Sequence, residues 1–155
     1  MIEIPPEFRQ RWIAHSANLM DSFRARTGRE LLAATGRAEE DALRLYNAPF
    51  VVVSHGIEPD PILNYGNRAA LDLWEMTPAQ FVATPSRLTA EPTLREARER
   101  LLAETAREGF VSGYEGVRIS ATGRRFRIHD VTLWTVTDPA GCALGQAAAF
   151  ARWTF

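Results

Sequence analysis

Tyr114 and Arg118 are the pair of residues whose types and spacing best suit ligand binding. They lie four positions apart in "SGYEGVRIS", a segment with the features of a strand, so their side chains fall on the same face. If that face points into the domain, a guanidinium and a phenol together suit a carboxylate or another small anion, because Arg can donate bidentate hydrogen bonds. If it points outward, Arg118 pairs with a surface acid. The sequence is equally compatible with both.

His55 and Arg87 are two further candidates for contact with a ligand. His55 follows the apolar segment "PFVVVS", where it is either a ligand contact, with a charge that responds to pH, or a turn residue that bonds the local backbone. We favour the turn interpretation, because histidines commonly serve in that way. Arg87 lies in "TPSRLTAEP", a loop without a helical or strand period that we expect to pass near a pocket.

Neither a metal site nor a catalytic centre is predicted. Three scattered histidines and one cysteine, Cys142, give no metal-ligand spacing. All 18 basic residues are arginine, which excludes Schiff-base chemistry and a lysine general base. Ser54 and His55 are neighbours on a strand and point to opposite faces, and no acid–base pair has a spacing that places both groups in one cleft. We therefore favour a non-catalytic role over a small enzyme.

The composition of the 155 residues is that of one ordinary globular domain. Hydrophobic residues make up 46% of the chain and charged residues 24%, so a sizeable core can form. A net charge of −1 provides no field that would attract nucleic acid or an anionic membrane, which argues against both as partners. The N-terminus has no apolar secretory region and no segment resembles a bilayer span, so we expect a cytoplasmic protein.

Two helices are predicted before the first strand. Phe8, Trp12 and Phe23 recur at helical spacing over residues 7–24, which indicates an amphipathic helix. A second helix is expected over residues 38–47. The aromatic side of the first helix would either pack on this chain's own sheet or form a dimerisation face, and the sequence leaves both alternatives open.

Short helices with clear start signals are predicted in the middle of the chain. Asn67 follows the brief strand "ILNY" and is a good N-cap, because its side-chain oxygen accepts from an amide in the next turn. Thr77 is followed by Pro and, at the third position, by Gln, which is the pattern of a capping box. Thr93 precedes a Glu by the same spacing and predicts the cap of a third helix over about 93–108.

Strands are predicted on either side of these helices, and their order defines the fold class. The expected strands cover residues 49–54, 62–65, 111–120, 124–136 and 143–153. The order indicates an α+β domain, with a five-stranded antiparallel sheet, short helices on one face and two preceding N-terminal helices. We expect residues 1–47 to form the N-terminal helical extension and residues 48–155 the domain itself, as a single compact unit.

This order and several segments resemble the PAS fold and a PAS-related family. "ILNYGNRAALDLWEMTPAQF" resembles the PAS segment in which a strand leads into an Asn-x-Ala-Ala helix start. "APFVVVSHG", "TPSRLTAEP", "YEGVRIS", "GRRF" and "GQAAAFARW" are similar to segments of bacterial MEKHLA-domain proteins, and the likeness covers roughly residues 10–155. The same domain lies at the C-terminal end of the plant homeodomain–leucine-zipper regulators. This chain has no DNA-binding segment or zipper, so their transcriptional role does not transfer.

The resemblance implies a ligand held between the sheet and the short helices, and it allows cofactor signatures to be tested. Covalent flavin photochemistry in this fold requires a reactive Cys on the helix after the opening segment, and residues 82–92 contain none. A haem sensor typically requires a His on the third helix, and that helix has none. Both cofactors are therefore disfavoured, and the identity of any cofactor stays open.

Three functional classes remain at this point, and the small enzyme is the weakest of them. Trp74 and Trp134 would line an apolar pocket or simply fill the core. By fold analogy we favour a sensory module that binds a small apolar or anionic molecule and signals through its N-terminal helices. The alternative is a protein-interaction module, working as a homodimer or with another protein, whose core is filled and which binds no ligand.

Overall fold

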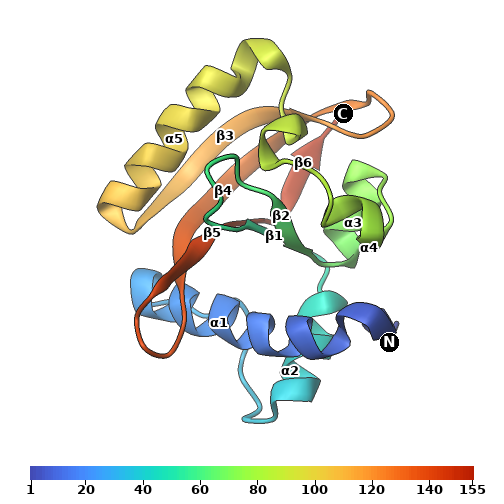
Figure 1. The fold of residues 1–155 in the computed structure, drawn as a ribbon, viewed down its shortest axis with the longest axis vertical. Helices are drawn as coiled ribbons and strands as arrows, with labels where there is room; N and C mark the ends of the chain where they lie inside the picture. The colour runs from blue at the N-terminus through green and yellow to red at the C-terminus, as the bar shows by residue number, and fades with distance from the viewer.

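The computed structural model describes residues 1–155 and shows one antiparallel sheet with helices on both faces (Figure 1). The strands are β1 (Val51–His55), β2 (Leu63–Gly66), β3 (Phe110–Ile119), β4 (Arg125–Thr137), β5 (Ala143–Phe150) and β6 (Arg152–Thr154). Their order across the sheet is β2-β1-β5-β4-β3, and β6 pairs with β4. This α+β arrangement confirms the predicted fold class.

The sheet has six strands where the sequence predicted five. The segment expected as one strand over residues 143–153 is divided at Ala151 into β5 and β6. The division lies opposite Asp130 of β4, whose backbone is left-handed (φ 50°): β5 pairs with β4 on one side of this residue and β6 on the other. A residue in this conformation interrupts the ladder of hydrogen bonds, as a β-bulge does, so the paired strand breaks at the same place.

The helices divide between the two faces of the sheet (Figure 1). They are α1 (Arg9–Thr27), α2 (Ala38–Tyr46), α3 (Arg68–Trp74), α4 (Pro78–Phe81) and α5 (Arg95–Glu108), with the 3-10 turns η1 (Pro6–Phe8), η2 (Ser86–Thr89) and η3 (Pro92–Leu94). Helix α1 runs along one face with α2 beside it, whereas α3, α4 and α5 cover the other. Buried side chains from both layers and from the sheet form one continuous core.

The aromatic side of η1 and α1 packs against this chain's own sheet. Phe8, Trp12 and Phe23 are only 2–6% exposed. Trp134 of β4 points toward α1, where its ring meets that of Phe23 edge-on at 4.9 Å and its Nε1 donates to the hydroxyl of Ser22 at 3.0 Å. The three aromatic residues are therefore internal packing residues and do not form an exposed dimerisation face.

Asn67 caps α3 and also joins it to two other segments. Its Oδ1 accepts from the amide of Ala70 at 3.2 Å, as an N-cap does, and from the amide of Val52 at 3.1 Å. Its Nδ2 donates to the carbonyl oxygens of Leu45 at 3.2 Å and Phe50 at 2.8 Å. The side chain is fully buried. It therefore holds the end of α2, the start of β1 and the start of α3 in one position.

The other two predicted caps differ from one another. Thr77 begins α4 with a capping box, because its hydroxyl accepts from the amide of Gln80 while the Gln80 side chain accepts from the amide of Thr77. The predicted cap at Thr93 is wrong. Thr93 lies inside η3, and α5 begins at Arg95 without a side-chain cap. A proline at the first position of η3 starts this tighter turn before the helix can form.

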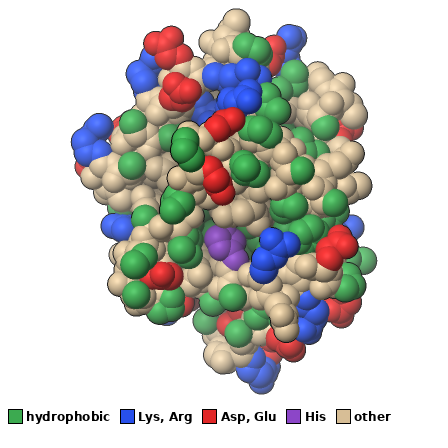
Figure 2. All heavy atoms as spheres, in the orientation of Figure 1, with side chains coloured by type: hydrophobic (Ala, Val, Ile, Leu, Met, Phe, Trp, Pro, Cys, Tyr) green, Lys and Arg blue, Asp and Glu red, His purple; other side chains and the backbone are tan.

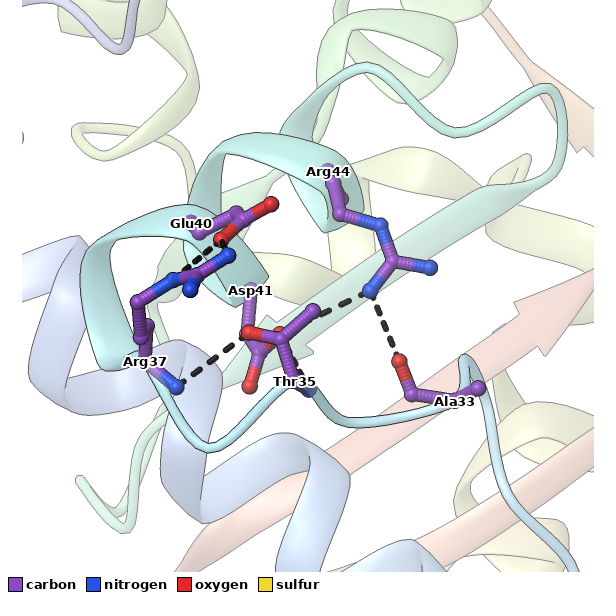
Figure 3. A network of polar contacts seen from close by, with 6 residues as sticks. All are labelled: Ala33, Thr35, Arg37, Glu40, Asp41 and Arg44. Carbon is purple, nitrogen blue, oxygen red and sulfur yellow. Dashed lines mark hydrogen bonds and ion pairs between the residues drawn. The ribbon is translucent and has the colours of Figure 1, made fainter.

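The segment between α1 and α2 is held in place by a polar network (Figure 3). Oδ1 of Asp41 accepts from the amide of Thr35 at 2.9 Å and from its hydroxyl at 2.8 Å, and Arg44 donates to the carbonyl oxygen of Ala33 at 2.7 Å. Burial alone would raise the pKa of Asp41, but the bonds from Thr35 and the charge of Arg44 outweigh it and lower the pKa. The negative charge of Asp41 thus anchors the first turn of α2 to the preceding segment.

Candidate functional site

A cavity of about 60 Å³ lies between the sheet and the layer formed by α3, α4, η2 and α5. Most of its lining is apolar, for example Leu101 of α5, Leu133 of β4 and Phe150 of β5. No Asp or Glu lines it, whereas two arginines, Arg98 and Arg118, do. The cavity therefore combines an apolar wall with concentrated positive charge.

The two arginines are buried without any carboxylate partner. Each is only 7% exposed. Arg98 of α5 donates to the hydroxyl of Ser86 in η2. Arg118 of β3 donates to the carbonyl oxygen of Val117 at 2.9 Å and to the hydroxyl of Tyr114 at 3.4 Å. Burial, together with the positive charge of Arg118, lowers the pKa of Arg98 to about 10, so Arg98 is still protonated at neutral pH.

Two residues of the sheet that line the cavity each carry a hydrogen-bond acceptor. His55 of β1 and Gln146 of β5 lie opposite each other in the strand pairing. Nδ1 of His55 lies 3.0 Å from the carbonyl oxygen of Gly56; because a carbonyl only accepts, Nδ1 carries the proton and Nε2 is an acceptor. Gln146 donates from Nε2 to the carbonyl oxygen of Leu102 at 2.8 Å, which leaves its Oε1. His55 Nε2 and Gln146 Oε1 are both buried without a partner in the protein.

Burial also keeps His55 uncharged. Loss of solvation is the largest influence and lowers its pKa; the hydrogen bond to Gly56 opposes this, and the positive charge of Arg98 adds to it. A neutral His55 retains its Nε2 lone pair as an acceptor at neutral pH. The turn bond predicted for His55 is present, and the same residue lines the cavity.

Tyr114 and Trp74 complete the polar lining. The Tyr114 ring crosses Gly116 of the same strand: a Cβ atom at position 116 would lie 2.3 Å from the Tyr114 hydroxyl oxygen. The guanidinium of Arg118 lies over that ring, with Cζ 5.6 Å from the ring centre. Nε1 of Trp74 is a buried donor without a partner in the protein. The expected pair Tyr114 and Arg118 thus lies on the inward face, in contact with each other.

A β-bulge decides which side chains of β2 reach the cavity. Ser54 pairs with Tyr65, but the next residue, His55, pairs with Leu63, so Asn64 is an extra residue in β2. Because of this insertion Leu63 lines the cavity, whereas Tyr65 packs its ring against Trp12 of α1 at 5.0 Å on the opposite face. Without the bulge, simple alternation would place Leu63 and Tyr65 on the same face.

Two of the sequence-predicted pocket residues lie elsewhere. Trp134 follows Leu133 on β4, so the alternation of the strand directs Leu133 into the cavity and Trp134 toward α1. Arg87 lies in η2 beside Ser86, but its side chain points outward and pairs with Asp60 at 3.2 Å. Neither residue therefore lines the cavity. The other four predicted residues do line it: His55, Trp74, Tyr114 and Arg118.

Two residues of the cavity, Arg98 and Gln146, were not predicted from the sequence. Arg98 shares one buried side of α5 with Leu101 and Thr105. A charged residue on the apolar side of a helix is an unusual pattern and was the available signal. Gln146 gave no such signal, because Gln is an ordinary residue on a partly exposed strand.

On the opposite face of β1, a short polar chain links the sheet to α1. Nε2 of His15 lies 2.8 Å from the hydroxyl oxygen of Ser54, and that hydroxyl donates to Oδ1 of Asn64 at 2.5 Å. Since the single hydroxyl proton goes to Asn64, His15 is the donor to Ser54. Trp12 adds a bond from Nε1 to the Asn64 carbonyl oxygen at 3.0 Å. Burial lowers the pKa of His15 to about 4, which keeps it neutral.

The face of the molecule shown in Figure 2 has no counterpart to the charge inside the cavity. Figure 2 shows basic and acidic side chains scattered over the displayed face, without a large area of one sign. None of the helices combines the length and apolar composition that a bilayer span requires.

Comparisons with known proteins agree with this architecture. A family model described as the MEKHLA domain matches residues 13–155. The PAS domain of a protein from Colwellia psychrerythraea has a TM-score of 0.63 at 12% identity, over 72% of this chain and 92% of that chain. A light-oxygen-voltage domain studied with a flavin analogue gives 0.54 at 16% identity, over 70% and 78%.

A third solved structure has a small molecule in its description. The PAS domain of a LuxR-family transcriptional regulator from Burkholderia thailandensis, in complex with ethanol, gives a TM-score of 0.53 at 17% identity, over 68% of this chain and 91% of that chain. At these identities the likeness establishes a shared PAS fold and no more. No curated protein matches the sequence.

Proposed function

The chain belongs to the MEKHLA-domain family, and on this premise we propose that it is a sensory module that holds a small molecule in its cavity and signals through its N-terminal helices. The PAS and light-oxygen-voltage neighbours support a sensory fold. The observation that carries the proposal is a set of buried polar atoms without a partner in the protein, all on residues that line the cavity. They are His55 Nε2, Gln146 Oε1 and Trp74 Nε1.

Buried polar groups of this kind are rare, because each costs free energy unless it is hydrogen-bonded. A core that only needed to be filled would carry apolar side chains at these positions. A ligand with matching polar groups would supply the missing partners, and its affinity would come from them and from the apolar wall.

Strand β1 supports a route from the cavity to α1. His55 reaches the cavity, and the preceding residue, Ser54, bonds His15 of α1 on the opposite face. A ligand that contacts His55 would shift β1 and thereby favour one of two packings of α1 against the sheet. The ligand would act on α1 only to the extent that it binds the two packings with different affinity.

A flavin, as in the light-oxygen-voltage neighbour, does not fit this chain. A volume of about 60 Å³ accommodates roughly four to six non-hydrogen atoms, far fewer than the three fused rings of a flavin. Cys142, the single cysteine, is exposed on the turn between β4 and β5 and does not line the cavity. The ligand that we propose therefore has only a few non-hydrogen atoms.

Native mass spectrometry of the freshly purified chain, together with an absorption spectrum, tests the proposal. We expect an added mass per chain that survives desalting and disappears on denaturation. A matched control is the Leu101→Trp variant, in which a larger side chain fills the cavity, and it should lose the added mass while remaining folded. An unmodified mass for the wild type, and no small molecule that raises its melting temperature, would contradict ligand binding.

The small volume of the cavity favours a second candidate, a protein-interaction module that binds no ligand. Its interaction surface would not be the aromatic side of α1, because those residues are buried within the chain. Analytical ultracentrifugation separates the candidates: a concentration-dependent dimer with an unmodified mass supports the interaction module, and a monomer with an added mass supports the sensor.

A further inference from the structure

Arg98 and Arg118 enter the cavity from opposite layers, one from α5 and one from β3, and together they are its only charged residues. Two buried positive charges without a counter-charge are costly, both from lost solvation and from mutual repulsion. From this juxtaposition we infer that the ligand is a small carboxylate that also carries a hydroxyl group. The inference rests on the proposed sensory function and deepens it by naming the ligand class.

The two arginines supply donors for the carboxylate. The hydrogen bonds of Arg98 in the protein are limited to one, from Nη2 to Ser86, so the remaining N–H groups of its guanidinium are available. Arg118 has N–H groups left over in the same way, beside the Tyr114 hydroxyl. Planar guanidinium groups match a carboxylate with two parallel bonds, and such charge-assisted bonds are the strong ones.

His55 and Gln146 supply acceptors, which a carboxylate alone cannot satisfy. His55 Nε2 and Gln146 Oε1 are acceptors on directly opposed residues of β1 and β5. The oxygens of a carboxylate cannot donate to the lone pairs of His55 Nε2 and Gln146 Oε1. A hydroxyl group can donate to one of them. The ligand must therefore carry both an acceptor group and a donor group.

The size and lining of the cavity limit the ligand further. Roughly four to six non-hydrogen atoms fit the volume of about 60 Å³, which is the range of glycolate and lactate. The predominantly apolar wall disfavours a dianion such as inorganic phosphate, whose further oxygens would lack donors. A short hydroxycarboxylate meets all three conditions. Its carboxylate accepts from the arginines, its hydroxyl donates to an acceptor of the sheet, and its small size leaves only a hydrogen or methyl group toward the apolar wall.

Isothermal titration calorimetry with matched probes tests the inference on the wild-type chain. Lactate should bind, while lactamide, which lacks the charge, and propionate, which lacks the hydroxyl, should each bind about 10- to 100-fold more weakly, since each loses strong or buried hydrogen bonds. Inorganic phosphate should not bind. Amide spectra recorded by NMR should place the lactate-induced shifts at α5, β1 and β5.

Variants separate the roles of the two arginines from general effects of charge. Arg98→Gln and Arg118→Gln should each weaken lactate binding by about 10- to 100-fold. Arg100→Gln is the matched control, because Arg100 lies on the same helix but is exposed and pairs with Glu96. It should bind lactate as the wild type does. If a cavity variant fails to fold, the comparison of lactate with lactamide on the wild type still tests whether the cavity recognises a carboxylate.

The outcomes distinguish this inference from the proposed function. Equal affinity for lactate and lactamide would overturn the carboxylate assignment, and equal affinity for lactate and propionate would overturn the hydroxyl assignment. In both cases ligand binding itself would stand. An absence of heat and of spectral shifts with every probe would overturn the inference, and an unmodified native mass in addition would overturn the sensory proposal as well.

Discussion

Nε2 of His15 lies 2.8 Å from the hydroxyl oxygen of Ser54, so α1 is hydrogen-bonded to the strand whose next residue, His55, lines the cavity. Adjacent residues of a strand point to opposite faces. A single strand, β1, therefore touches the candidate ligand site on one side and the N-terminal helix on the other. In the proposed function, a ligand-induced shift of His55 would therefore reach α1 through the adjacent residue, Ser54.

The first prediction concerns the pH dependence of stability. Burial lowers the pKa of His15 from 6.5 to about 4 in the folded state. Below pH 6.5 the unfolded chain binds a proton that the folded chain does not, so the free energy of unfolding falls as the pH decreases and levels off below about pH 4. His15 alone should account for a loss of about 3 kcal/mol across this window.

Urea denaturation at a series of pH values measures this loss. His15→Gln keeps a side-chain donor for Ser54 but does not titrate in this range, so its free energy of unfolding should fall less steeply between neutral pH and pH 4. A variant with the same slope as the wild type would show that His15 does not cause the acid sensitivity. His55, whose pKa burial also lowers, would then be the group to replace next.

The second prediction concerns Asn67. Asn67→Ala removes four hydrogen bonds and leaves the buried amide of Val52 and the carbonyl oxygen of Phe50 without this partner. We expect a loss of about 3–5 kcal/mol in the free energy of unfolding, measured by urea denaturation. Thr77→Ala is the control: it removes only an exposed cap and should cost about 1 kcal/mol. Equal losses in both variants would contradict the junction role of Asn67.

The third prediction concerns Gly145, which lies beside His55. A Cβ atom at position 145 would lie 1.9 Å from the His55 backbone oxygen, and the backbone φ of 140° is one that other residues rarely adopt. Gly145→Ala should therefore cost more than about 3 kcal/mol, because backbone atoms must move. Gly141→Ala is the control, with φ 86° but open space around the added atom, and should cost about 1 kcal/mol. Thermal unfolding of both variants checks this, and a mild effect at Gly145 would contradict it.

The fourth prediction separates binding from stability at Arg118. Arg118→Met replaces an unpaired buried charge by an apolar side chain of similar length, so it should leave the free energy of unfolding unchanged or raise it by about 1 kcal/mol. The same variant should lose ligand binding. Chemical denaturation and calorimetry on one preparation measure the two effects. A large loss of stability would show that Arg118 has a structural role.

The sequence was sufficient for the features that depend on neighbouring residues. The strands and helices follow from local periodicity, and the N-caps at Asn67 and Thr77 follow from side chains that reach only the next turn. The order of these elements, with the resemblance of several segments, was enough to predict a PAS-like α+β fold. Where a competing local turn intervened, as at Thr93, the prediction failed.

The tertiary structure alone decided which face each residue occupies. Trp134 and Leu133 are adjacent, and only the placement of α1 against one face and α5 against the other determines that Leu133 lines the cavity. The bulge at Asn64 reverses the alternation of β2, and a single inserted residue of this kind leaves no reliable mark in the sequence.

The charge of the cavity was likewise decided by long-range packing. Tyr114 and Arg118 could be paired from their spacing on one strand, but the sequence was equally compatible with an outward face for both. Arg98 joins them from a helix, and Gln146 joins His55 from a neighbouring strand far along the chain. Spacing along the chain specifies neighbours within an element, whereas contacts between elements depend on how the layers pack, and only the folded structure defines that packing.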